Sequence, residues 1–170
     1  MFCSTHNRAP AAQRGGWLSA ARRRQAMGRI DATNIYTRLW VGSEPPFDHD
    51  LPDFDLLVLC AREIQPEPEK IAFRRTVFRC PLPDAQLNIQ ELTAAVLVGK
   101  AVGDALMGGH RALVTCAKGL NRSAFISALA LARITKMSAE QIVTLVRTRR
   151  GPSAMSNPYF CQVLRSIVRR

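Results

Sequence analysis

The sequence lacks the features that mark disulfide-bonded, metal-binding or membrane-spanning proteins. Its five cysteines are an odd number without regular spacing and without a C-x-x-C pair, which argues against a disulfide scaffold or a structural zinc site. The histidines His6, His49 and His110 show no ligand spacing, so we expect no metal and no other cofactor. No apolar run approaches the roughly 18 residues that a membrane span needs. We therefore expect a soluble protein of a reducing compartment, the cytoplasm.

Acidic residues are missing from both ends of the chain. Residues 1–30 and 141–170 each hold six arginines and no Asp or Glu, whereas residues 31–140 hold 12 basic and 13 acidic residues. The net charge of +11 therefore lies at the ends, where it suits acidic partners such as nucleic acid or anionic lipid. Aromatic residues are not interleaved with these arginines as base-stacking surfaces require, so solvated charge is the simpler interpretation.

Periodicity is absent from the start of the chain and appears from Ile30 onward. Residues 1–28 are rich in Ala, Arg and Gly, which favours a mobile extension, although an arginine-rich, acid-free start is also typical of organelle transit segments. We therefore divide the chain into a basic extension, 1–29, and one domain, 30–170, large enough for its own core.

The apolar patterns of this domain predict an α/β fold. Alternation or short apolar runs predict strands over residues 34–43, 54–60, 76–82 and 112–116. Apolar residues at helical spacing predict helices over residues 90–107, 123–136, 139–150 and from Pro158 onward. Ser138 and Gln141 form a capping box at the start of the third of these helices. We expect a central, mostly parallel sheet with helices on both faces.

Residues 112–124, ALVTCAKGLNRSA, join the last predicted strand to the central helix. Of the five cysteines, only Cys116 has an arginine, Arg122, six positions later. Backbone N–H groups of such a loop can surround an anion, and Gly119 permits the backbone conformation that this requires. The helix that follows directs its positive N-terminal end at the same place. The predicted phosphate-binding residues are Ala117, Lys118, Gly119, Leu120, Asn121 and Arg122.

The residue types of this loop suit phosphoryl transfer. A cysteine is a nucleophile only as a thiolate, and loop amides, helix dipole and Arg122 all favour that anion at Cys116. A guanidinium also presents a planar fork for two phosphate oxygens. The leaving oxygen needs a proton, and Asp84 follows the third predicted strand on a loop that can reach the site.

These residues resemble the cysteine-dependent protein tyrosine phosphatases, and among them the small atypical dual-specificity phosphatases. The resemblance covers roughly residues 35–164: IYTRLWVGSEPP is similar to the family's opening strand, CAKGLNRSA to its C-x5-R-S loop, and MSAEQIVTLVRTRRGPSAMSNPYFCQVL to its closing helices. It implies hydrolysis of phosphotyrosine, and of phosphoserine or phosphothreonine, in a protein or peptide substrate.

The resemblance also implies roles for single residues. Cys116 would form the phosphocysteine, Arg122 would bind the phosphoryl group, Ser123 would hydrogen-bond the thiolate, and Asp84, 32 residues before the cysteine, would be the general acid. One residue departs from the family: Thr115 stands where a histidine usually precedes the cysteine, so we expect a higher thiol pKa than the family norm and a slower enzyme.

Cys60, in the apolar run LLVLCARE, is similar in placement to the cysteine that forms a disulfide with the catalytic one in some relatives. A buried core cysteine is the simpler interpretation. The resemblance nevertheless makes Cys60 the candidate redox partner of Cys116.

Two other functions remain open at this point. An RNA 5′-phosphatase of the same superfamily would suit the GLNR sequence and the basic ends, and a non-catalytic phosphate-binding module would suit Thr115. A phosphoinositide is a further candidate substrate, for which Lys118 and Arg62 would supply a positive rim. Asp84 favours a monoesterase, because a polyphosphate leaving group needs little general acid.

Overall fold

A five-stranded sheet organises the part of the chain that the computed structural model describes, residues 30–168. Its strands are β1 (Ala32–Tyr36), β2 (Leu39–Gly42), β3 (Leu56–Ala61), β4 (Thr76–Leu82) and β5 (Ala112–Thr115). The strand order is β1-β2-β5-β3-β4, with an antiparallel β1–β2 pair and three parallel pairs. Because β5 lies between β2 and β3, the loop that follows β5 emerges from the middle of the sheet.

Side-chain caps begin three of the four α-helices of the described chain, which are α2 (Ile89–Met107), α3 (Arg122–Ile134), α4 (Ala139–Arg150) and α5 (Pro158–Ile167). Asn88 and Ser138 form capping boxes on α2 and α4, and Asn157 caps α5 ahead of Pro158. The N-cap of α3, Asn121, makes no such bond. The first backbone N–H groups of α3 are therefore left for another acceptor.

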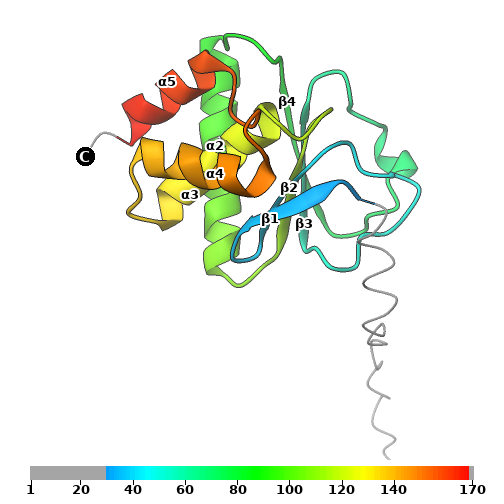
Figure 1. Ribbon diagram of the computed structural model, residues 1–170. Coiled ribbons are helices and arrows are strands. Elements are labelled where there is room, and N and C mark those ends of the chain that lie inside the picture. Colours follow the sequence, from blue (N-terminus) through cyan, green and yellow to red (C-terminus); the bar gives the residue numbers. More distant parts are fainter. Residues whose placement is uncertain (1–29, 169–170) are drawn as a thin grey trace, which may run out of the picture.

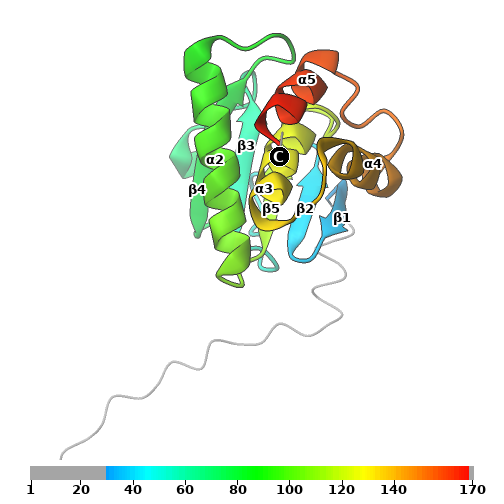
Figure 2. The same cartoon turned by 90° about the vertical axis from the view of Figure 1, so that its left-hand side faces the viewer.

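The four α-helices cover one face of the sheet, with α3 between α2 and α4 (Figures 1 and 2). All α3 residues from position 122 to 131 are buried, as expected of a helix packed on all sides. The opposite face packs a second cluster made by loops 43–55 and 62–75, which includes the short 3-10 helix η1 (Pro68–Lys70). Its buried members are Leu51, Phe54, Leu57, Leu59, Ile71, Phe73 and Leu113.

The predicted α/β class, with a mostly parallel sheet flanked by helices, is confirmed. On the second face, however, the expected helical cover is limited to η1. The other predicted strands and helices agree with the observed ones to within a few residues.

The single strand predicted over residues 34–43 is wrong, because these residues form the β1–β2 hairpin. Arg38 takes a left-handed φ of 60° in the turn, and Tyr36 pairs with Leu39. A turn this short leaves the alternation of apolar and polar residues almost unbroken, so the sequence pattern does not reveal it. The basic extension, residues 1–29, lies outside the described residues.

Candidate active site

The Cys116–Arg122 loop begins directly after β5 and ends at the first residue of α3. The N–H of Cys116 donates to the Gly42 carbonyl at the end of β2, with an N–O distance of 3.2 Å. The loop is therefore fixed at its start by the neighbouring strand, and at its end by the most deeply buried helix.

Hydrogen bonds from residues outside the loop hold three of its carbonyl groups. The Arg150 guanidinium donates to the carbonyls of Lys118 and Gly119, over 3.3 and 3.1 Å, and the N–H of Met155 donates to Leu120 O, over 2.9 Å. The C=O and N–H of one trans peptide point in opposite directions. Carbonyls held outward therefore turn the next N–H groups inward, and two of these, from Gly119 and Leu120, hydrogen-bond the Cys116 sulfur.

Gly119 is required in this loop for two reasons. Its φ is +66°, where a side chain is strained, and a Cβ there would lie 2.5 Å from the carbonyl carbon of Gly42 and 2.6 Å from Nη2 of Arg150. The first contact is with backbone, which cannot swing aside. The glycine therefore lets the loop lie directly against β2.

The Cys116 thiol is 4% exposed and lies 3.2 Å from the Ser123 hydroxyl. Burial raises the pKa of this thiol, but hydrogen bonds from the Ser123 hydroxyl and from the backbone N–H groups of Ser123, Gly119 and Leu120 outweigh burial and lower it. The net direction favours the thiolate.

Thr115, the residue immediately before Cys116, is 1% exposed. Its hydroxyl donates to the Val58 carbonyl on β3 across 3.0 Å. It thus ties β5 to the neighbouring strand and adds no positive charge near Cys116.

Arg122 enters the site from the first turn of α3 and is 6% exposed. Its Nη1 and Nη2 donate to the two carboxylate oxygens of Glu63, over 2.5 and 2.7 Å, and Nη1 also donates to Leu82 O. The hydrogen bond with Arg122 lowers the pKa of Glu63 to about 2, and the same bond raises the pKa of Arg122. This bidentate pair fixes the plane of the guanidinium.

The remaining donors of Arg122 lie on the other side of its guanidinium. Three of its five N–H groups bond to Glu63 and Leu82, which leaves Nε–H and one Nη2–H. Nε is buried and has no acceptor among residues 30–168. Nε–H and this Nη2–H lie parallel, so together they form a second fork that fits two oxygens of one phosphoryl group.

Asp84 lies on the loop between β4 and α2 and is held by two side-chain amides. Asn121 donates to one carboxylate oxygen over 3.1 Å, and Asn157 donates to the other over 3.2 Å. The side-chain oxygen Oδ1 of Asn121 in turn accepts hydrogen bonds from the backbone N–H groups of Ser156 and Asn157. The predicted acid is thus connected to the Cys116 loop and to the start of α5.

Cys60, the candidate redox partner, is fully buried on β3. Leu59 pairs with Thr115 across the parallel β3–β5 ladder, so Cys60 follows beside Cys116 at the ends of these strands. Burial raises the pKa of Cys60 well above its ordinary value, with the neighbouring thiols Cys80 and Cys116 as further causes. Cys60 is therefore a protonated thiol next to an activated one.

The structure brings Cys116, Arg122, Ser123 and Asp84 together, and it orients the loop N–H groups toward the sulfur. The Asn121 side chain holds Asp84 and the Lys118 side chain is exposed, so the phosphate contact that we predict for these two residues remains one through their backbone N–H groups. Sequence reasoning missed the supporting residues Glu63, Arg150, Ser156 and Asn157. No local motif marks them. The one available signal is that a buried arginine such as Arg122 needs a carboxylate partner, which Glu63 supplies.

No family model matches the sequence, and no curated protein matches it closely enough to count as a relative. Solved structures do match. Over 81% of this chain and 92% of the other, it is similar to human DUSP28, with 23% identity and a TM-score of 0.68. Tk-PTP in its active form matches over 82% and 97%, with 22% identity and a TM-score of 0.70.

A third match is the kinase associated phosphatase, crystallised with a serine in place of its catalytic site cysteine, at 14% identity and a TM-score of 0.59 over 79% of this chain and 90% of the other. The chain therefore has the fold of the cysteine-dependent tyrosine phosphatases. Within that class, its fold is that of the small atypical dual-specificity phosphatases. No helix among residues 30–168 is long and apolar enough to cross a membrane.

Proposed function

We propose that this protein is a phosphatase that hydrolyses phosphotyrosine, and also phosphoserine or phosphothreonine, through a phosphocysteine on Cys116. The observation that carries the proposal is the convergence of three groups on one place. These are a thiol whose pKa is lowered, the second fork of Arg122, and inward-facing loop amides. A phosphoryl dianion accepts hydrogen bonds from the guanidinium fork and the loop amides, and its phosphorus is the electrophile that the thiolate attacks.

In the first step the Cys116 thiolate attacks phosphorus. A sulfur–phosphorus bond forms, the bond from phosphorus to the substrate oxygen breaks, and Asp84 gives its proton to that leaving oxygen. The Arg122 fork and the loop N–H groups hold the three equatorial oxygens, where charge is spread in the transition state.

In the second step water attacks phosphorus and the sulfur–phosphorus bond breaks. The Asp84 carboxylate, now ionised, takes a proton from that water, and inorganic phosphate leaves. The Ser123 hydroxyl, 3.2 Å from the sulfur, stabilises the departing thiolate. The kinase associated phosphatase, whose catalytic site holds a cysteine on the same fold, supports this role for Cys116.

A side-by-side substrate panel tests the proposal. Phosphotyrosine, phosphoserine and phosphothreonine peptides, phosphoinositides and 5′-triphosphate RNA are assayed for released phosphate, with Cys116→Ser as the blank. We expect turnover of phosphotyrosine peptides that falls at least about thousandfold in Cys116→Ser.

Each other outcome points to a different function. Turnover confined to triphosphate-ended RNA would identify an RNA 5′-phosphatase. Phosphate binding without turnover of any substrate would identify a phosphate-binding module. Asp84→Asn also distinguishes an RNA 5′-phosphatase from a monoesterase, because loss of the acid slows release of a poor leaving group far more than release of a polyphosphate.

A further inference from the structure

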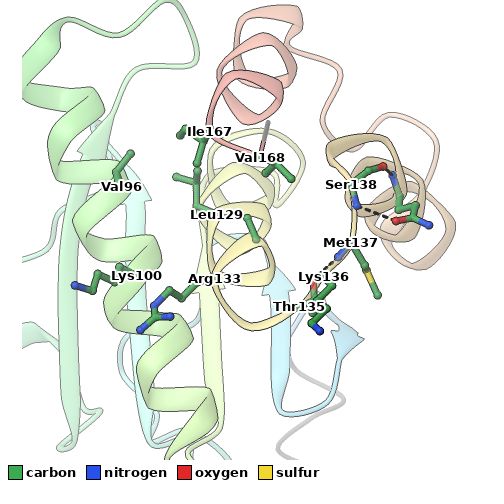
Figure 3. Close-up of a pocket in the computed structure, with 12 residues that line it drawn as sticks. Val96, Lys100, Leu129, Arg133, Thr135, Lys136, Met137, Ser138, Ile167 and Val168 are labelled. Atoms are coloured by element: carbon green, nitrogen blue, oxygen red, sulfur yellow. Dashed lines mark hydrogen bonds between the residues drawn. The ribbon is translucent and has the colours of Figure 1, made fainter. Parts of the chain in front are cut away.

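A groove of about 490 Å³ lies among the helices that cover the sheet (Figure 3). It is lined by α2, by the last turns of α3, by residues 135–138 and by the end of α5. Since α3 begins at Arg122 in the catalytic loop and runs for 13 residues, its far end lies roughly 20 Å from that loop. The groove is therefore separate from the proposed catalytic site.

Apolar and cationic side chains form two adjacent rows in this groove. Val96 and Lys100 lie one turn apart on α2, and Leu129 and Arg133 lie one turn apart on α3. In Figure 3, Val96 and Leu129 are nearer α5, whereas Lys100 and Arg133 lie farther from it.

Residues outside α2 and α3 extend both rows. Ile167 and Val168 of the α5 end join the apolar row, and Lys136 joins the cationic side (Figure 3). Gly99 keeps α2 close to α3, because a Cβ there would lie 2.5 Å from Cβ of Leu129. The close packing of the two helices sets the rows side by side.

The groove presents apolar surface and positive charge, of which only part is paired with a carboxylate. Val96 is 37% exposed and Ile167 is 44% exposed, so both contribute apolar surface to the groove. The lining holds three cations and no acidic residue. Arg133 pairs with Asp104 at 3.2 Å, but Lys100 and Lys136 have no ion-pair partner within residues 30–168.

We propose that this groove docks an acidic, amphipathic segment of a partner protein. Apolar side chains of the segment lie on the Val96–Leu129–Ile167 row, and its carboxylates face Lys100, Lys136 and Arg133. Charge excludes the two nearest alternatives: residues 1–29 carry six arginines and no acid, and a second copy in a two-fold contact would place the same cations opposite each other. Docking here leaves the Cys116 loop free.

Binding of a defined probe to the full chain tests this proposal. The probe is a fluorescein-labelled peptide built from repeats of Leu-Glu-Glu-Leu, titrated by fluorescence anisotropy with inorganic phosphate present to occupy the catalytic loop. We expect saturable binding that weakens at least about tenfold in the Lys100→Glu, Lys136→Glu double variant. The matched control, Lys70→Glu on η1, keeps the affinity of the wild type.

Further measurements distinguish the proposed acidic segment from other molecules that could fill the groove. The same peptide with Gln for Glu should bind about tenfold more weakly, since it loses the carboxylates. Backbone amide shifts should move at residues 96–100, 129–138 and 167–168. Equal binding by the Gln peptide, equal loss in Lys70→Glu, or shifts confined to the Cys116 loop would overturn the proposal. It would equally fail if a peptide of residues 1–29 moved these amides instead, or if sedimentation showed a dimer that Val96→Asp dissociates.

Discussion

At the residue scale, Ser123 contributes most directly to the state of the nucleophile. Its hydroxyl and its backbone N–H both hydrogen-bond the Cys116 sulfur, and hydrogen bonds to the thiolate lower the thiol pKa against the effect of burial. Thr115, immediately before the cysteine, contributes no charge to this effect.

Alkylation of Cys116 by iodoacetamide as a function of pH measures this effect. We expect a midpoint below the pKa of about 8.5 of a free cysteine, and a higher midpoint in Ser123→Ala. Ser127→Ala is a matched control, because Ser127 lies one turn later on α3 and its buried hydroxyl has no partner in the described chain. A wild-type midpoint at the free-cysteine value would mean that the site binds phosphate without activating the thiol.

Glu63 acts on Arg122 rather than on the substrate. Its two oxygens hold the guanidinium in one plane, with the second fork turned to the site. Glu63→Gln removes one of these charge-assisted bonds, and we expect kcat/KM to fall roughly fivefold to tenfold, given that Glu63 is half exposed. Glu69→Gln, on the same long loop but without an arginine partner among residues 30–168, should not change it. Equal activity of the two variants would exclude a positioning role for Glu63.

At the scale of elements, the catalytic loop depends on β2 and on the end of α4. Gly42 lies against Gly119, and Arg150 of α4 holds the loop carbonyls while its guanidinium pairs with Asp31 ahead of β1. These contacts join segments between 31 and 119 residues apart. The loop N–H groups therefore face the sulfur only in the complete fold.

Two glycine substitutions separate backbone strain from loop geometry. Gly109 and Gly119 both have positive φ, but a Cβ on Gly109 meets nothing within 4 Å, whereas a Cβ on Gly119 meets β2. We expect Gly109→Ala to cost about 1–2 kcal/mol of stability and to leave turnover per folded molecule unchanged. Gly119→Ala should also lower turnover at least about a hundredfold, because it displaces the anion-binding amides. Thermal unfolding and phosphopeptide turnover, measured on both variants, check this; equal turnover would contradict the account.

The sequence was sufficient to predict these elements wherever local chemistry determines them. Consecutive residues carry the signal for the Ser138–Gln141 capping box, for the buried run of β3 and for the apolar α3. The C-x5-R spacing, together with the strand before it and the helix after it, singles out Cys116 and Arg122 as candidates. Glu63, Arg150 and Asn157 could not be predicted in the same way. Their roles come from contacts 31 to 73 residues away, to Gly119, Asp84 and Arg122, which only the tertiary fold creates.

At the scale of the whole molecule, two carboxylates outside the core link stability to pH. Hydrogen bonds from Arg150 and Arg122 lower the pKa of Asp31 and of Glu63, the latter to about 2. A lowered folded-state pKa contributes stability above the unfolded-state value of about 4, and this contribution is lost as the pH falls toward the folded-state value.

The free energy of unfolding should therefore decrease between about pH 5 and pH 2, and Asp31→Asn, Glu63→Gln should show a shallower decrease. Urea unfolding across that range, with Glu69→Gln as control, measures the slopes. A double variant with the wild-type slope would show that other carboxylates control the acid transition.

Oxidation is a second whole-molecule property, because Cys60 lies on β3 and Cys116 directly follows the neighbouring strand β5. If Cys60 is the redox partner, peroxide oxidises the Cys116 thiolate to a sulfenic acid, and the Cys60 thiol then attacks it, releasing water and forming a disulfide. We expect peptide mapping after peroxide treatment to find a Cys60–Cys116 link and dithiothreitol to restore activity. Irreversible loss without that link would mean that Cys60 is a core residue only.

The central claim is that Cys116 carries the phosphoryl group during turnover. The most direct measurement is rapid quenching of the enzyme with a ³²P-labelled phosphotyrosine peptide, followed by mapping of the labelled residue. The account predicts label on the peptide that contains Cys116 in the wild type and none in Cys116→Ser. Phosphate release with no covalent label in any of these proteins would contradict it.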